Sequence, residues 1–205
     1  ESGAEGGRDA PTDEEAVAAA AAALRAARPG SAVLIAGGGA ADAGAELAAL
    51  AAQLKAPVVT TSAGKGVLPE DDPHSLGCRL HFSAVRDLLR SAEFLVAVGT
   101  QLSSTDLWVD RLETTGRVID INRDPGDFGR LSPASIRLRG SADAVLRRLN
   151  AKIGAVVGAA PGGEESGGGD VADTVAAIRE RCREELAGVM GVTEELVETQ
   201  IRVVR

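Results

Sequence analysis

Aromatic side chains are almost absent from this chain, which has no tyrosine, one tryptophan and three phenylalanines among its 205 residues. A core of ordinary size must therefore be built from valine, leucine, isoleucine and alanine. These residue types favour closely packed helices on a sheet of small β-branched side chains. The hydrophobic fraction of 44% is sufficient for one such domain with appendages.

Positive charge is also scarce, since 22 basic residues stand against 30 acidic ones and the net charge is −8. Nucleic-acid binding requires clustered lysine and arginine, and no such cluster occurs, so a nucleic-acid partner is not expected. No apolar run has the length of a membrane span, because the alanine-rich run Ala16–Ala27 is short and contains Arg25.

A secretory signal is lacking as well, because the first residues contain neither a basic start nor an apolar stretch. The two cysteines, Cys78 and Cys182, are far apart in sequence. A cytoplasmic protein with reduced thiols is the default expectation.

Short apolar runs alternate with amphipathic segments along most of the chain. Strands are predicted at residues 31–36, 57–61, 94–98, 118–121 and 135–138, and helices at 14–28, 42–55, 83–91 and 142–153. Thr12 or Asp13 is expected to cap the first helix, and Ser141 the helix that begins at 142. This alternation predicts an α/β fold, a doubly wound, Rossmann-like parallel sheet with helices on both faces.

The composition divides the chain into four parts. Residues 1–11 are polar and glycine-rich and are expected to be a disordered lead-in, and 12–153 form the α/β domain. Residues 154–170 are a flexible linker by composition. The segment 171–205 reads as a helical connector whose last helix breaks off in mid-pattern, which indicates a piece of a longer chain.

Three consecutive glycines, Gly37, Gly38 and Gly39, follow the first predicted strand. They could hold a diphosphate at a helix N-terminus, but the spacing is not GxGxxG, because the next glycine is Gly44. A tight strand-to-helix turn that needs a positive φ accounts for these glycines better and is the favoured interpretation.

A second glycine-rich loop, Gly64-Lys65-Gly66, is not a P-loop, because Val67 stands where serine or threonine is required. It follows the second predicted strand, at the edge where open α/β sheets bind ligands. Lys65 is a candidate contact for an anion or a neighbouring domain, although a solvated lysine is the commoner case.

Metal and hydrolase chemistry receive little support. Cys78 and His81 have CxxH spacing and His74 is near, yet no second tight pair completes a structural zinc site. Ser103, Ser104 and Asp106 lie together without a GxSxG elbow and are expected to be turn and cap residues.

Asp120 stands near the end of the fourth predicted strand, in VIDIN, and Gly99 ends the third. An acidic residue in this place can hold a ribose hydroxyl, or it can be a routine strand-end carboxylate. The sequence does not distinguish these two roles.

Ordered blocks of sequence resemble the central domain of thiamine-diphosphate-dependent enzymes, in the branch of acetolactate synthase and the 2-oxo-acid decarboxylases. The blocks span most of 14–153: LIAGGGAADAGAELAALAAQLKAPVVTTSAGKGVLPEDDPHSLG, LLRSAEFLVAVGTQLSSTDLW, RVIDINRDPGDFGR and RGSADAVLRRL. The block VGTQLSSTDLW looks closer to the acetolactate-synthase-like decarboxylases, including those of guanidino-2-oxo acids.

The resemblance implies a three-domain enzyme in which thiamine diphosphate and Mg²⁺ sit between a pyrimidine-binding and a diphosphate-binding domain. Those two domains lie outside this chain, and the complete enzyme is implied to be a homo-oligomer. The chain alone is then expected to be inactive, acting as scaffold and oligomer contact, with 171–205 leading into the third domain.

Flavin is a further cofactor that the resemblance raises. On the family pattern, Gly37–Gly39, Gly64–Gly66, Gly99 and Asp120 lie on one rim that could hold FAD or another nucleotide. Flavin-holding relatives carry an arginine-bearing segment of the kind RFDDR, whereas here Gly99 is followed by TQLSSTD. This departure argues against flavin and leaves an FAD- or nucleotide-binding module, or a vestigial cleft, as alternatives.

Overall fold

A single parallel sheet organises the protein in the computed structural model, which describes residues 13–102, 104–109, 113–127, 136–157 and 170–190. The strands are β1 (Ala32–Ala36), β2 (Val58–Thr60), β3 (Ser75–Gly77), β4 (Phe94–Val98), β5 (Arg117–Asn122) and β6 (Ile136–Arg139). The helices are α1 (Glu14–Ala26), α2 (Gly44–Leu54), α3 (Ser83–Ser91), α4 (Ser104–Leu107), α5 (Ala142–Val157) and α6 (Val171–Met190), with 3₁₀ turns η1 (Gly38–Ala40) and η2 (Pro125–Asp127).

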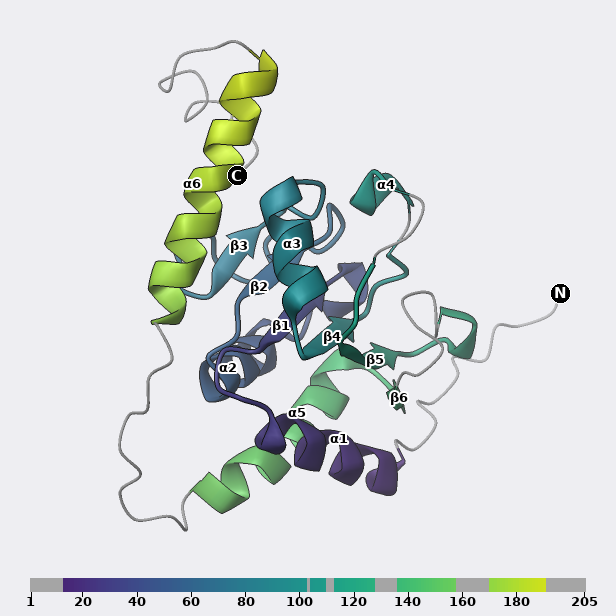
Figure 1. The fold of residues 1–205 in the computed structure, drawn as a ribbon. Coiled ribbons are helices and arrows are strands. Elements are labelled where there is room, and N and C mark those ends of the chain that lie inside the picture. Colours follow the sequence, from purple (N-terminus) through teal and green to yellow (C-terminus); the bar gives the residue numbers. More distant parts are fainter. Residues whose placement is uncertain (1–12, 103, 110–112, 128–135, 158–169, 191–205) are drawn as a thin grey trace, which may run out of the picture.

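The strand order is β3-β2-β1-β4-β5-β6, and every neighbouring pair is parallel. The chain winds outward from β1 to β3, returns to the centre, and winds outward again from β4 to β6 (Figure 1). The predicted doubly wound parallel sheet is therefore confirmed. The point between β1 and β4, where the winding reverses, is the place at which such sheets bind ligands.

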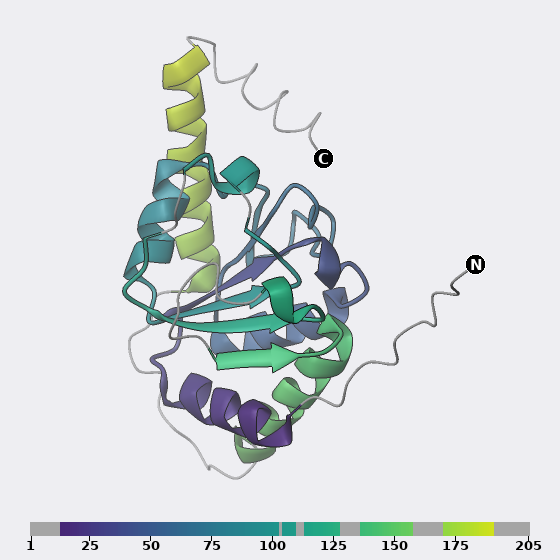
Figure 2. The ribbon, with the colours of Figure 1, turned by 90° about the vertical axis from the view of Figure 1, so that its right-hand side faces the viewer.

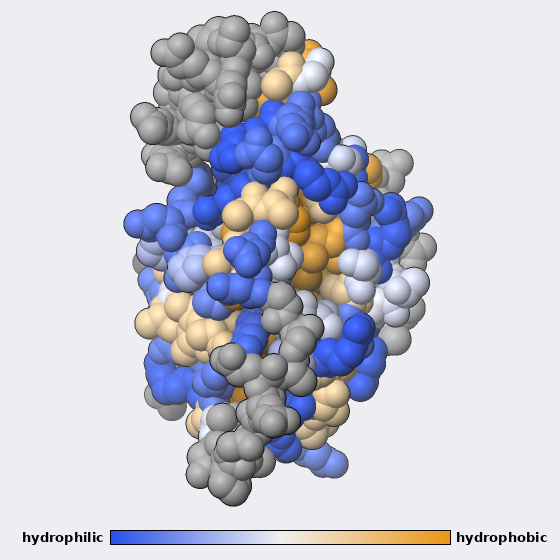
Figure 3. Space-filling view, turned by 60° about the vertical axis from the view of Figure 1, so that its left-hand side comes forward, coloured by the Kyte–Doolittle hydropathy of each residue, from blue (hydrophilic) through white to orange (hydrophobic). Residues whose placement is uncertain are grey.

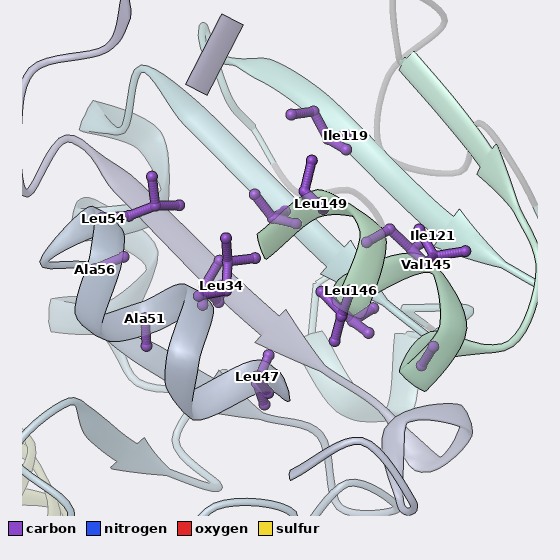
Figure 4. Packing of buried hydrophobic residues seen from close by; sticks show 14 of the residues in the cluster. Leu34, Leu47, Ala51, Leu54, Ala56, Ile119, Ile121, Val145, Leu146 and Leu149 are labelled. Atoms are coloured by element: carbon purple, nitrogen blue, oxygen red, sulfur yellow. The ribbon is translucent and has the colours of Figure 1, made fainter. Parts of the chain in front are cut away.

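Helices cover both faces of the sheet. One hydrophobic cluster joins α1, α2 and α5 to the sheet, and a second joins α3 and α6 to the opposite face (Figure 2). The first cluster includes Leu47 of α2 and Leu146 of α5 together with Leu34 and Ile121 of the strands (Figure 4). β1 and β4 are buried along their whole length, which explains why they read as unbroken apolar runs.

Helix α6 completes the second face with the buried side chains Val175, Ile178 and Cys182. Its first turn is capped by Asp170, whose carboxylate accepts the amide of Ala172. On the side of the molecule where α6 lies, hydrophilic residues surround a smaller apolar area (Figure 3). The segment predicted as a connector is thus packed onto the domain at 170–190.

Several boundaries differ from the sequence prediction. α5 continues to Val157, so the first residues of the predicted linker are helical. The rest of that linker, the lead-in and the segment 191–205 lie outside the described residues. β3 was not predicted, because three residues after a long loop give no periodic signal. No described helix combines the length and apolarity that crossing a membrane requires.

Candidate functional site: a cleft at the switch point of the sheet

A cleft of about 560 Å³ lies at the carboxyl ends of the strands, beside the point where the winding reverses. Its walls come from segments that follow different strands. They are lined by Gly38, Gly39, Ala41 and Asp42; Thr61 and Ala63; Gly99, Thr100, Gln101 and Asp106; Ile121, Asn122, Arg123, Asp124 and Asp127; and Gly140, Ser141 and Ala142. This is the ligand-binding position that the fold predicts.

The glycine triplet after β1 packs tightly against Gly99 after β4. A Cβ on Gly37 would lie 2.4 Å from the Gly99 oxygen, and a Cβ on Gly39 would lie 2.9 Å from the Gly99 Cα. Gly99 itself has a φ of 56°, a left-handed conformation that favours glycine. These residues lack side chains because two loop backbones must touch here.

Two amides of the triplet are already used within the protein. Gly37 N donates to the carbonyl of Val98 and Gly39 N to that of Gly99, each at 2.9 Å. Helix α2 begins only at Gly44, and the carbonyl oxygen of Val67 lies 2.5 Å from where a Gly44 Cβ would stand. Two of the three triplet amides that could hold a diphosphate at this turn are therefore engaged. The turn interpretation explains these contacts, while cofactor binding by Gly37–Gly39 stays a prediction.

The second glycine loop divides between two places. Gly64 packs on the end of β1, where its Cβ would lie 2.2 Å from the Ala36 oxygen, and its amide donates to Thr61. Lys65 and Gly66 line a separate hollow of about 390 Å³ instead. Of the candidate site residues that the sequence singled out, Gly38, Gly39 and Gly99 line the cleft together. Lys65 and Gly66 line the separate hollow.

Asp120 lies below the cleft and does not line it. Only 3% of the residue is exposed, and its Oδ1 accepts a 2.8 Å hydrogen bond from Nδ2 of Asn122. The same Nδ2 donates to the carbonyl of Thr100, so the two side chains fasten the end of β5 to the loop after β4. Asn122, two residues further along the strand, lines the cleft instead. The available signal for Asn122 was its polar side chain directly after the predicted strand 118–121.

Four carboxylates line the cleft: Asp42, Asp106, Asp124 and Asp127. Arg123 is the only basic residue among the described lining. Asp106 accepts the Ser62 amide at 3.3 Å. Sequence reasoning missed three of these carboxylates, although the block NRDPGD directly after the β5 pattern is rich in acid.

The excess negative charge opposes a diphosphate, whose own charge it would repel across the cleft. Groups of three or more His, Cys, Asp or Glu side chains suited to a metal ion are also absent from the described residues. Neither thiamine diphosphate with its metal nor the diphosphate of FAD fits the residues that this part of the chain presents.

A second group of side chains lies on the α3 face, away from the cleft. The His81 ring stacks on Trp108 at 4.4 Å between centroids, and Trp108 is 72% exposed. Burial lowers the pKa of His81 from its ordinary value, an effect that the nearby Glu185 carboxylate opposes. Burial also raises the pKa of Cys182 to about 11. Burial is therefore the main cause of both shifts.

The remaining candidate metal ligands do not form a cluster. His74 Nδ1 lies 3.1 Å from a carboxylate oxygen of Asp72, in the turn before β3. Cys78 is half-buried and contacts the Ser62 hydroxyl at 3.8 Å.

Known proteins give the site a family context. The family model described as "Thiamine pyrophosphate enzyme, central domain" matches residues 17–149, well over half of the chain. A probable 2-ketoarginine decarboxylase of Pseudomonas aeruginosa is 40% identical over 111 residues, covering 54% of this chain and 20% of that protein.

Two acetolactate synthase large subunits are also similar. That of Methanocaldococcus jannaschii, itself named as probable, is 36% identical over 111 residues, with 53% of this chain and 19% of that protein covered. That of Corynebacterium glutamicum is 35% identical over 113 residues, with coverage of 53% and 18%. The matched part of the chain spans about a fifth of the length of these relatives.

The fold has a counterpart among solved structures. An X-ray structure assigned to a thiamin diphosphate-dependent enzyme isolated from Mycobacterium smegmatis aligns with a TM-score of 0.56 and 22% identity. The alignment covers 74% of this chain and 30% of that one. Because the family model matches most of the α/β domain, the chain belongs to the family of thiamine pyrophosphate enzyme central domains.

Proposed function

We propose that the chain is the central domain of a thiamine diphosphate- and magnesium-dependent enzyme that acts on 2-oxo acids. The observation that carries this proposal is the family match over residues 17–149 together with relatives that are a decarboxylase and acetolactate synthases. Identity to the decarboxylase, at 40%, exceeds that to the synthases, at 36% and 35%. A decarboxylase of a guanidino-2-oxo acid is therefore the preferred activity.

The role of this domain is structural. Its cleft is acidic and two amides of its glycine triplet are engaged, so thiamine diphosphate is held by other domains of the complete protein. When bound there, thiamine diphosphate supplies a carbanion-stabilising centre for cleavage next to the oxo group. Magnesium, a hard cation with oxygen ligands, anchors the diphosphate in those domains. The central domain contributes scaffold and oligomer contacts.

Two assays test the proposal. The complete protein that contains this chain, loaded with thiamine diphosphate and Mg²⁺, is expected to release CO₂ from 2-ketoarginine faster than from pyruvate. Removing the metal by EDTA dialysis should abolish the release, and adding Mg²⁺ back should restore it. Turnover that survives without thiamine diphosphate contradicts the proposal.

The second assay uses the 205-residue chain by itself. Calorimetric titration with thiamine diphosphate and Mg²⁺ is expected to give no saturable heat. Tight binding by this chain alone contradicts a purely structural role.

A further inference from the structure

We propose that Trp108 and Val189, the latter in the last turn of α6, form a docking corner for the segment of this chain that follows α6, residues 191–205. Contact between the segment and the docking corner fixes the direction in which the chain leaves the domain. The proposal concerns contacts within the 205-residue chain and does not depend on the reaction proposed above.

The backbone holds Trp108 outside the domain. Its neighbours Leu107 and Val109 pack in the second hydrophobic cluster, whereas Trp108 is 72% exposed. Its φ of 55° lies in the left-handed region, which is strained for a bulky side chain. Strained residues of this kind cluster at functional sites, and tryptophan is enriched among the residues that anchor interfaces. Trp108 is therefore placed as an anchor for a partner surface.

The apolar stripe of α6 continues past the edge of the domain. Cys182 is buried and Leu186 is half-buried, while Val189, the next position on the same face, is 82% exposed. The last turns of α6 project beyond the sheet at the end of the molecule where α4 lies (Figure 1, Figure 2). Trp108 directly follows α4, and it and Val189 are the exposed large hydrophobic side chains of the described residues.

A short series of contacts connects Trp108 to α6. Its ring stacks on that of His81 at 4.4 Å between centroids. Ser83, two residues after His81, donates its amide and its hydroxyl to the carboxylate of Glu185 at 2.9 and 2.6 Å. Five residues after Glu185, or about 7.5 Å along a helix, α6 ends at Met190. The chain therefore leaves α6 within reach of Trp108.

The sequence of the segment suits this place. Read as a helix from Thr193, it carries charged residues on one face, namely Glu195, Glu198 and Arg202. Its apolar residues fall on the other face: Leu196, Val197, Ile201, Val203 and Val204. An amphipathic helix of this kind is stable only when its apolar face is covered. Because the segment is tethered at the docking corner, its effective concentration there is on the order of millimolar, which favours it over an unconnected partner.

The first test uses the emission of Trp108, the sole tryptophan, in the 205-residue chain. Val197→Asp places a charge on the apolar face of the segment. The emission maximum is expected to move to longer wavelength and quenching by acrylamide to increase, because the indole returns to water. Thr199→Asp is the matched control, since it adds the same charge in place of a side chain of similar size. It lies about 200° around the helix axis, on the polar face, and should leave the emission unchanged.

The second test removes the anchor. In Trp108→Ala, a glutamate-specific protease is expected to cleave the segment 191–205 about tenfold faster than in the parent chain, because cleavage follows the population of the undocked form and an aromatic anchor contributes an energy of that order. Gln101→Ala, an exposed residue earlier in the same loop, is the control and should leave the cleavage rate unchanged. Thermal unfolding of each variant verifies that the domain is folded.

Three results would each overturn the proposal. Equal emission from Val197→Asp and the parent would mean that the segment does not cover Trp108. An equal shift in Val197→Asp and Thr199→Asp would mean that the apolar face is not the contact. Unchanged cleavage in Trp108→Ala would mean that the segment does not depend on this anchor. An emission maximum that changes with chain concentration, together with dimers in sedimentation analysis, would assign the docking corner to a second copy instead.

Discussion

Glu185 of α6 caps α3, because its carboxylate accepts hydrogen bonds from the backbone amide of Ser83 at 2.9 Å and from the Ser83 hydroxyl at 2.6 Å. Ser83 is the first residue of α3, and the helix receives no side-chain cap from its own N-cap residue, Phe82. A carboxylate in this position also interacts favourably with the helix dipole. The helix that supplies the cap lies beyond residues 17–149, which the family model matches.

Removing this cap should destabilise the protein. Glu185→Ala leaves the amide and the hydroxyl of Ser83 without their acceptor and is expected to cost about 1 kcal/mol of unfolding free energy. For a chain of this size the melting temperature should fall by about 2–4 °C. Glu184→Ala, an exposed neighbour on the same helix, is the control and should leave the melting temperature nearly unchanged. An equal loss in both variants would show that the cap contributes nothing.

Gly99 should not tolerate a side chain, with or without a ligand. In Gly99→Ala the Cβ would lie 2.4 Å from the carbonyl carbon of Gly39, on a backbone with a φ of 56°. Strain and overpacking together are expected to cost at least about 3 kcal/mol, measured by urea unfolding.

Gly188 provides the contrasting case, because it lies in α6 and no atom stands within 4 Å of its would-be Cβ. Gly188→Ala should stabilise the protein by about 0.5 kcal/mol or more through helix propensity. A neutral Gly99→Ala would refute the packing account of the glycine triplet.

Stability should depend on pH through His81. Burial is the main cause that lowers the pKa of His81 below 6.5, the Glu185 carboxylate raises it, and Arg86 and Arg79 lower it further. The unfolded chain therefore binds more protons than the folded one as the pH falls below about 6.5. The stability that His81 contributes to the folded state is fully present above that pH. It is lost as the pH drops through the lowered pKa of His81 in the folded state.

Melting temperatures measured from pH 7.5 to pH 5 check this dependence. His81→Gln should flatten the acid limb of the profile relative to the parent chain. The emission of Trp108, the sole tryptophan, monitors the stacked pair over the same range. An unchanged acid limb in His81→Gln would assign the loss of stability to carboxylates instead.

The two thiols should react at very different rates. Cys182 is 1% exposed with a pKa raised to about 11, so its thiolate fraction at pH 8 is about one in a thousand. Cys78 is half-buried and accessible. Maleimide labelling at pH 8 should therefore modify Cys78 first in the folded chain and both thiols in urea. Early labelling of Cys182 would mean that α6 leaves the domain readily.

Local patterns predicted much of the fold. The runs at β1 and β4 matched to within one residue, since strands buried on both faces are continuous apolar segments. Asp13, one of two proposed caps, accepts the amides of Glu15 and Ala16. These features depend on residues close in sequence, which is why they can be read from the chain.

The candidate site was only partly predictable. The edge of the sheet at which the cleft lies followed from parallel topology, but Lys65 lines another hollow and Asp120 lies beneath the cleft. The exact end of a strand decides which polar side chain reaches the cavity, and a shift of two residues exchanges Asp120 for Asn122.

By itself the sequence determined the family, the alternation of strands and helices, and the small-residue core, because each depends on local order along the chain. Only the tertiary structure decided that Asp42 and Asp127 share one cleft and that Glu185 reaches Ser83. The members of these pairs are 85 and 102 residues apart in sequence, and the folded sheet brings them together through packing that no local pattern encodes.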